Sequence, residues 1–158
     1  MKKYLLLLLS AGIILIGCAT TIVKPTIVDT EIIKAPFDKV WAAVVETVAE
    51  KSYPIDLAEK SSGLITTKFV KFADGLYADK KIDEIAVRPS VFMSTWKSGR
   101  YLFNIFVKSI SQKETSVKIT SHIEGFENNI NKDWIECYSK GVIEENLFKT
   151  IKSKITVN

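Results

Sequence analysis

The sequence predicts an α+β fold, with an antiparallel sheet of about five strands and two helices on one face of it. Two segments, 55–72 and 100–126, alternate apolar and polar residues around a short turn, which is typical of β-hairpins. One segment before the hairpins and one after them carry apolar residues at helical spacing. The strands lie too close together along the chain for the crossovers of a parallel sheet. The expected order is therefore β-α-ββ-ββ-α.

The first strand and helix are expected at the start of this domain. Residues 27–33 form a β-rich run that Ala35 and Pro36 end. Proline is favoured in the first turn of a helix, because its missing N–H has no partner to lose there. One face of the helix that follows is apolar: Phe37, Val40, Trp41, Val44 and Val48. This stripe predicts burial against the sheet.

The two hairpins follow the helix, which Pro54 ends. The first hairpin turns at residues 61–63, where Gly63 can adopt a positive φ angle. The second turns at residues 111–114, and its second strand places the only histidine, His122, on the polar face. One histidine with two cysteines does not supply the ligands of a zinc site. We therefore expect no metal.

A final helix is expected from Lys132 to about Lys154, with Asn131 as its cap. Its apolar face would contain Trp134, Tyr138, Val142, Phe148, Ile151 and Ile155. Gly141 falls inside this segment, where glycine costs roughly 1 kcal/mol relative to alanine. We therefore expect Gly141 to pack closely against the sheet or the first helix.

Residues 73–99 are longer than a connection in this fold requires. The stretch from Asp79 to Ala86 has the character of a short helix, and the large apolar residues around it exclude a flexible linker. Two interpretations remain open: the segment folds back over one end of the sheet, or it forms an exposed contact surface or lid. The candidate contact residues belong to types enriched at interface hot spots. They are Tyr77, Arg88, Phe92 and Trp96.

The first 17 residues have the pattern of an export signal, with two lysines before an apolar run. The run ends in Leu15-Ile16-Gly17-Cys18, which resembles the lipobox of bacterial lipoprotein signal peptides. The resemblance implies a signal peptide of residues 1–17, cleavage between Gly17 and Cys18, and acyl chains on Cys18. Residues 18–26 would then be a lipidated stem, and residues 27–158 a single domain. Ala19 implies the outer membrane, with the domain at the inner leaflet facing the periplasm.

Two alternatives to lipidation remain. The stretch from Tyr4 to Val23 carries no charge and has about the length of a membrane span. Ordinary secretion is the other alternative, although Leu15 is large for the position it would occupy before the cleavage site. If Cys18 carries lipid, Cys137 has no intrachain partner. Cys137 is then either a small core residue or a reactive thiol.

Charge and motifs exclude several functions. The chain has 22 basic and 18 acidic residues, and the excess falls further once the signal is removed, so no nucleic-acid partner is expected. The sequence contains no glycine-rich phosphate loop, no Gly-x-Ser-x-Gly and no His-Glu-x-x-His. We therefore expect no enzyme and no cofactor.

Three stretches carry a family resemblance: residues 35–41, residues 53–67 and residues 138–144. Together they resemble small bacterial outer-membrane lipoproteins with a helix-grip-like domain, distantly similar to the C-subunit lipoproteins of the β-barrel assembly machinery. The first stretch is also similar to the start of Bet v 1-like and START-like lipid-binding domains. The resemblance implies a long last helix gripped by a curved sheet.

Two functions follow from this reading. The first is a lipid-anchored binding or scaffolding module that acts through contacts with an envelope protein. The alternative is a carrier or sensor of an apolar ligand held between the sheet and the C-terminal helix. A pocket of roughly 300 Å³ or more would favour the carrier.

Overall fold

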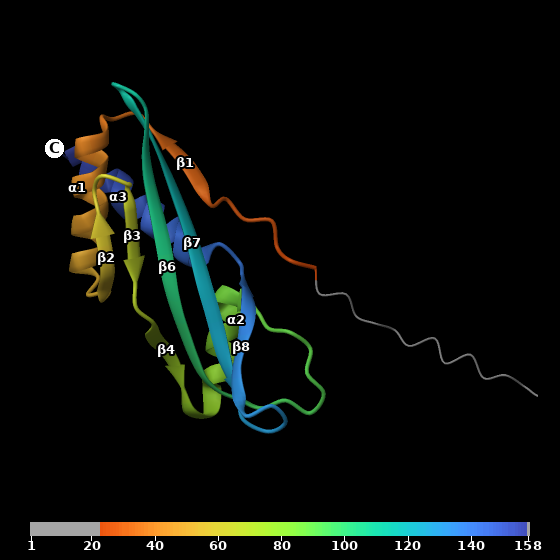
Figure 1. The fold of residues 1–158 in the computed structure, drawn as a ribbon. Helices are drawn as coiled ribbons and strands as arrows, with labels where there is room; N and C mark the ends of the chain where they lie inside the picture. Colours follow the sequence, from red (N-terminus) through yellow and green to blue (C-terminus); the bar gives the residue numbers. More distant parts are fainter. Residues whose placement is uncertain (1–22, 158) are drawn as a thin grey trace, which may run out of the picture.

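The computed structural model describes residues 23–157, and Figure 1 shows their arrangement. Gly17 and Cys18, the predicted cleavage and lipidation site, lie outside the described residues. The fold is α+β, as predicted. Within the described residues it has eight strands rather than about five, and three helices longer than a single turn rather than two.

Two long antiparallel strands form the centre of the sheet, β6 (Trp96–Ser111) and β7 (Glu114–Glu127). Each central strand pairs with two short strands along its outer edge. β6 pairs with β3 (Leu64–Thr67) and then with β4 (Val70–Asp74). β7 pairs with β1 (Thr30–Ile33) and β8 (Asp133–Ser139). The outermost strands are β2 (Ile55–Glu59) beside β3 and β5 (Ala86–Val87) beside β8.

The helices cover one face of this sheet and lie behind it in Figure 1. α1 (Phe37–Glu50) and α3 (Val142–Val157) pack against each other over one half of the sheet. α2 (Ala78–Ile85), preceded by the short helix η1 (Gly75–Tyr77), packs on β4 and β6 over the other half. The helical layer is therefore divided into two parts.

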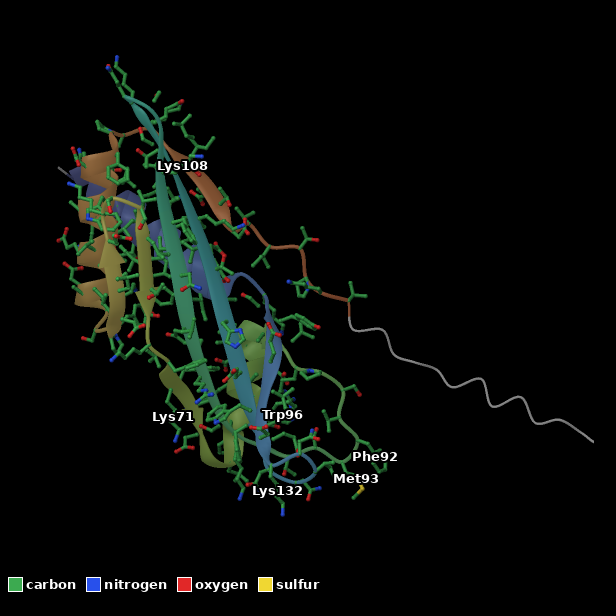
Figure 2. All side chains as sticks on the ribbon, viewed as in Figure 1. Lys71, Phe92, Met93, Trp96, Lys108 and Lys132 are labelled. Carbon is green, nitrogen blue, oxygen red and sulfur yellow. The ribbon has the colours of Figure 1, made fainter. Side chains whose placement is uncertain are left out.

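The core lies between the helices and the inner face of the sheet. Val40, Val44 and Val48 of α1 are fully buried, which confirms the predicted stripe. The central strands alternate as predicted, with Val117 and Ile119 buried while Lys118 and Thr120, which follow them, are exposed. Figure 2 shows the charged side chains spread over the surface around this core.

The predicted helix from Lys132 was wrong in its first half. Residues 133–139 form strand β8, and α3 begins only at Val142. Trp134 and Tyr138 have helical spacing, but the residues between them, Ile135 and Cys137, pair with β7 and contribute to the core instead. Pairing β8 with β7 covers a strand edge that would otherwise be open. Asn131 does not cap a helix, because strand β8 follows it; its N–H donates to the Glu127 carboxylate.

Gly141 lies before α3 and not within it, so the expected packing inside a helix was also wrong. Its φ angle is +86°, in the left-handed region that favours glycine. A Cβ atom there would meet Ile27 at 3.4 Å, an ordinary contact. Backbone conformation, rather than close packing, therefore explains this glycine.

Residues 73–99 are mostly regular structure. They include the end of β4, η1, α2, β5 and the start of β6. Ala78, Ile82 and Ala86 are fully buried, so this part folds back over the sheet. Residues 88–95 form the remaining connection, and they lie at the end of the sheet where β6 begins and β7 ends (Figure 1).

Candidate functional site

The four candidate contact residues do not form one surface. Phe92 is 84% exposed and Tyr77 is 59% exposed, whereas Trp96 is 6% exposed and packs under Gly125. Arg88 forms two hydrogen bonds of 2.7 Å with the Asp83 carboxylate, and its guanidinium lies 5.4 Å from the Trp96 ring. Two of the four residues therefore hold the fold together, and two face solvent.

A cleft of about 400 Å³ opens between the two parts of the helical layer. Tyr53, Phe72 and Tyr101 form its floor, and α3 provides one wall through Ile143 and Leu147. Ile85, at the end of α2, contributes to the opposite side. The cleft therefore lies between the sheet and the C-terminal helix.

The floor of the cleft is a connected set of aromatic rings. The Tyr101 ring lies 5.4 Å from the Phe72 ring and 6.1 Å from the Tyr53 ring, and the Tyr53 ring lies 4.9 Å from that of Phe103. The Tyr101 hydroxyl donates to the Tyr53 hydroxyl at 3.3 Å. Burial, together with this hydrogen bond, raises the pKa of Tyr101 well above its usual value. Its phenol therefore stays neutral at physiological pH.

Local structure explains how these side chains reach the cleft. Tyr101 is on the inner face of β6 by strict alternation with Phe103 and Ile105. Tyr53 follows α1, where Ser52 has a positive φ angle of 55° and the Tyr53 N–H donates to the carbonyl of Val48. This reversal brings Tyr53 back over the inner face of the sheet.

The rim of the cleft is polar and basic. It is formed by Lys51, Asn146, Lys149 and Thr150. The Lys149 ammonium lies 2.7 Å from the Glu145 carboxylate one turn away on α3, whereas Lys51 has no ion pair within residues 23–157. An apolar chain could lie on the aromatic floor while an anionic group reaches the Lys51 ammonium at the rim.

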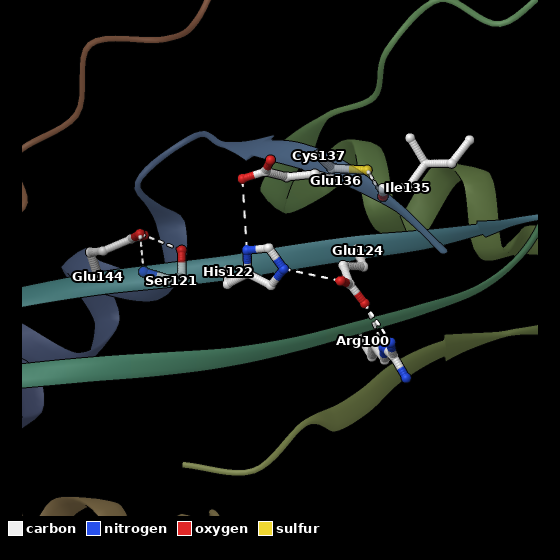
Figure 3. Close-up of polar contacts among 8 residues, drawn as sticks. All are labelled: Arg100, Ser121, His122, Glu124, Ile135, Glu136, Cys137 and Glu144. Atoms are coloured by element: carbon white, nitrogen blue, oxygen red, sulfur yellow. Dashed lines mark hydrogen bonds and ion pairs between the residues drawn. The ribbon is translucent and has the colours of Figure 1, made fainter. Parts of the chain in front are cut away.

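A second polar cluster lies on the helix-free face, but its groups are all engaged with one another (Figure 3). Arg100 donates to Glu124 at 2.7 Å, and its guanidinium is stacked 4.1 Å from the Phe69 ring and 3.9 Å from the Trp134 ring. His122 lies 3.0 Å from the other oxygen of Glu124. No group of three metal-binding side chains occurs in the part of the chain that the structure describes. The cluster braces β6, β7 and β8.

Two inward-facing groups near α3 also have structural roles. Glu144 is fully buried, and its carboxylate accepts hydrogen bonds from the hydroxyls of Ser121 at 2.5 Å and Ser139 at 2.9 Å. Cys137 is buried, and burial raises the pKa of its thiol to about 11. A thiol with this pKa is protonated at neutral pH and unreactive. Of the two interpretations of Cys137, the structure therefore favours a core residue.

The split in the helical layer is what sequence reasoning missed. The alternation of β6 indicates which way Tyr101 faces, but nothing near it in the sequence indicates that no helix covers it.

Among residues 23–157, no helix is long and apolar enough to cross a membrane. Comparison with known proteins adds no relative: no protein-family model matches the chain, and no curated protein matches it.

Proposed function

We propose that this chain is a lipid-anchored protein of the bacterial cell envelope whose domain binds a single-chain amphiphile with an anionic head group. The observation that carries the proposal is the cleft of about 400 Å³ between the sheet and α3. Its volume exceeds the roughly 300 Å³ expected of a small-molecule site. Its aromatic floor and basic rim match the two ends of such a ligand.

The expected affinity is modest. Each buried methylene contributes about 0.8 kcal/mol, so a chain of about ten carbons contributes roughly 8 kcal/mol before the cost of association is subtracted. The rim lysines add little, because exposed ion pairs contribute about 0.2–1 kcal/mol each. Binding of this strength suits a carrier or sensor that must also release its ligand.

Scaffolding through protein contacts at the outer membrane is supported less well. Two of its four candidate contact residues are unavailable to a partner, because Trp96 is buried and Arg88 is paired with Asp83. Only Tyr77 and Phe92 of that set remain exposed. Scaffolding therefore stays a prediction, which a crosslinking pull-down from intact envelopes would test.

Photoaffinity labelling tests the ligand function in the intact envelope. Cells expressing the full chain would receive palmitate with a diazirine in its acyl chain, and labelled peptides would be mapped by mass spectrometry after illumination. We expect labels on peptides that contain Tyr53, Tyr101 and residues 142–150. Acylation of Cys18 by the same probe falls on a separate peptide and does not interfere.

A matched pair of α3 variants makes the assignment specific. Asn146→Trp places an indole at the cleft, whereas Ser153→Trp places one on an exposed part of the same helix away from it. We expect the first variant to lose the labels and the second to keep them, with similar melting temperatures. Equal labelling of both variants, or labels only outside the cleft, would contradict the proposal.

A further inference from the structure

One end of the sheet exposes large apolar side chains from three separate segments, and we call these residues the apolar end. Each has more than half of its surface exposed. They are Leu76 and Tyr77 of η1, Phe92 and Met93 between β5 and β6, and Ile130 between β7 and β8. The strand register places these segments together, because Asp74 pairs with Ser98, Trp96 with Glu127, and Glu127 with Asp133. Figure 2 shows Phe92, Met93 and Lys132 at this end.

The loops of the apolar end are held to one another. The Asn129 side-chain amide donates to the carbonyl of Met93 at 2.8 Å, and the Asn128 N–H donates to the carbonyl of Thr95 at 2.8 Å. The exposed residues are therefore presented on a braced surface and not on an untied loop.

The carboxylate of Glu127 satisfies part of the backbone of the apolar end from inside the fold. Its buried carboxylate accepts the N–H groups of Asn129, Ile130 and Asn131, and also that of Thr95. Removing backbone groups from water is costly only where they lack partners. This arrangement lowers the cost of moving the apolar end into a less polar environment.

The segment between Cys18 and the domain, here called the tether, indicates which less polar environment lies near the apolar end. Only four residues separate Cys18 from Val23, so the five steps of this tether span at most about 18 Å at 3.6 Å per residue. The following residues lie against the sheet: Lys24 is over the Tyr138 ring at 5.9 Å, and Asp29 pairs with Lys118 at 3.3 Å. In Figure 1 the chain leaves the domain on the side that carries the loop between β5 and β6. A lipid at Cys18 would therefore hold the domain close to the bilayer, with the apolar end available to it.

Charges of both signs lie beside the apolar end, with Asp74 and Asp133 exposed next to two lysines that suit a lipid surface. Lys132 and Lys97 are exposed there, on either side of the paired ends of β6, β7 and β8. Cationic side chains next to apolar ones are typical of segments that lie in the interfacial region, where they contact phosphate groups.

From these observations we propose that the apolar end is a second membrane contact, which inserts Phe92, Met93 and Ile130 into the interfacial region of the bilayer that carries the lipid anchor. This inference rests on the proposed anchor at Cys18. The two contacts together fix the orientation of the domain relative to the membrane, because one tether alone leaves it free to rotate.

Depth-dependent fluorescence quenching tests the contact. The full lipidated chain would be reconstituted in vesicles of phosphatidylethanolamine and phosphatidylglycerol, with part of the lipid brominated near the head groups. Phe92→Trp reports on the apolar end, and Ile110→Trp reports on the β6–β7 turn at the opposite end, with the wild-type chain as the background. We expect the tryptophan introduced at position 92 to be quenched and shifted to shorter wavelength. The one at position 110 should keep the emission it has in lipid without bromine.

The outcomes separate the contact from the anchor. Mass spectrometry of the reconstituted protein reports acyl chains on residue 18, and their absence would overturn the anchor together with this inference. An acylated protein with equal emission at positions 92 and 110 would overturn the contact alone. A photoreactive phenylalanine analogue at position 92 that labels a protein in intact cells, and not phospholipid, would also overturn it.

Discussion

Glu127 is the residue on which the loops at the end of β7 depend. Burial by itself would raise the pKa of its carboxyl group, but the N–H groups of Asn131, Asn129, Thr95 and Ile130 outweigh burial. The net effect lowers the pKa of Glu127 from 4.5 to about 2. Because the pKa is lower in the folded state, ionised Glu127 stabilises the fold above pH 4.5, and this contribution is lost as the pH falls toward 2.

Glu127→Gln should remove this pH dependence. We expect the variant to melt at a lower temperature than the wild type at neutral pH and to show a smaller further decline between pH 4.5 and pH 2. Circular dichroism melts across this range measure both effects. Glu84→Gln, at an exposed position on α2, is the control and should melt like the wild type at neutral pH. A Glu127→Gln variant that declined as steeply as the wild type would show that Glu127 is not the responsible group.

Lys51 at the cleft rim should strengthen binding through the head group of the ligand and not through its acyl chain. With an exposed ion pair contributing up to about 1 kcal/mol, Lys51→Glu should reduce labelling by photoactivatable palmitate roughly two- to five-fold. Labelling by the corresponding alcohol should not change. Lys39→Glu, on an exposed part of α1 away from the cleft, should leave both unchanged. Equal losses with acid and alcohol would place the ligand charge elsewhere.

At the scale of elements, two glycines allow α2 to dock on the sheet. Gly99 of β6 and Gly125 of β7 are directly paired. A Cβ atom at Gly125 would lie 2.5 Å from the Trp96 ring, and one at Gly99 would lie 2.9 Å from the Ile82 side chain. The paired glycines therefore make the hollow that receives one helix and one indole.

Gly125→Ala should destabilise the fold by about 1–3 kcal/mol, because a rigid aromatic ring blocks the added methyl group. Urea denaturation measures the change in the free energy of unfolding. Thr120→Ala, at an exposed position on the same strand, should change it by less than about 0.5 kcal/mol. A Gly125→Ala variant as stable as the wild type would mean that Trp96 can move without cost.

The sequence predicts correctly those elements whose apolar pattern reflects burial against a single neighbouring layer. The α1 stripe and the alternation of β7 each reflect a single buried face, and both were confirmed. The boundary between β8 and α3 could not be found in this way, because Trp134, Tyr138 and Val142 have helical spacing while Ile135 and Cys137 alternate as a strand. Residues 133–139 form a strand and not a helix because they pair with the edge of β7, and that edge exists only in the assembled sheet.

The position of the candidate site could be anticipated from the sequence, but its opening to solvent could not. The sequence offered a ligand between the sheet and the last helix only as the alternative to scaffolding, and the structure has a cleft at that position. Its opening depends on α2 and α3 leaving Tyr101 uncovered, which no local pattern encodes. The contact residues Trp96 and Arg88 were chosen by residue type, and type alone does not distinguish an exposed aromatic or cation from one that stacks within the fold.

For the molecule as a whole, Cys18 should decide where the protein resides. Cys18→Ala should block lipidation and leave the signal uncleaved, because the cysteine side chain is the acyl acceptor that the lipobox resemblance implies. Membrane fractionation and intact-mass measurement check this, and the wild type should carry two or more acyl chains, since one alone binds a membrane only marginally. An unmodified residue 18 in the mature wild-type protein would contradict the prediction.

The central strands also set the timing of folding. β6 and β7 are consecutive, whereas the contact between Thr115 and Ala35 joins residues 80 positions apart. With synthesis at about 5–20 residues per second, the first strand and helix wait roughly 4–16 s for the strand that completes them. A single short helix is only marginally stable during that interval. The nascent chain therefore stays largely unfolded until late in its synthesis, which is the state that the proposed export as an extended polypeptide would require.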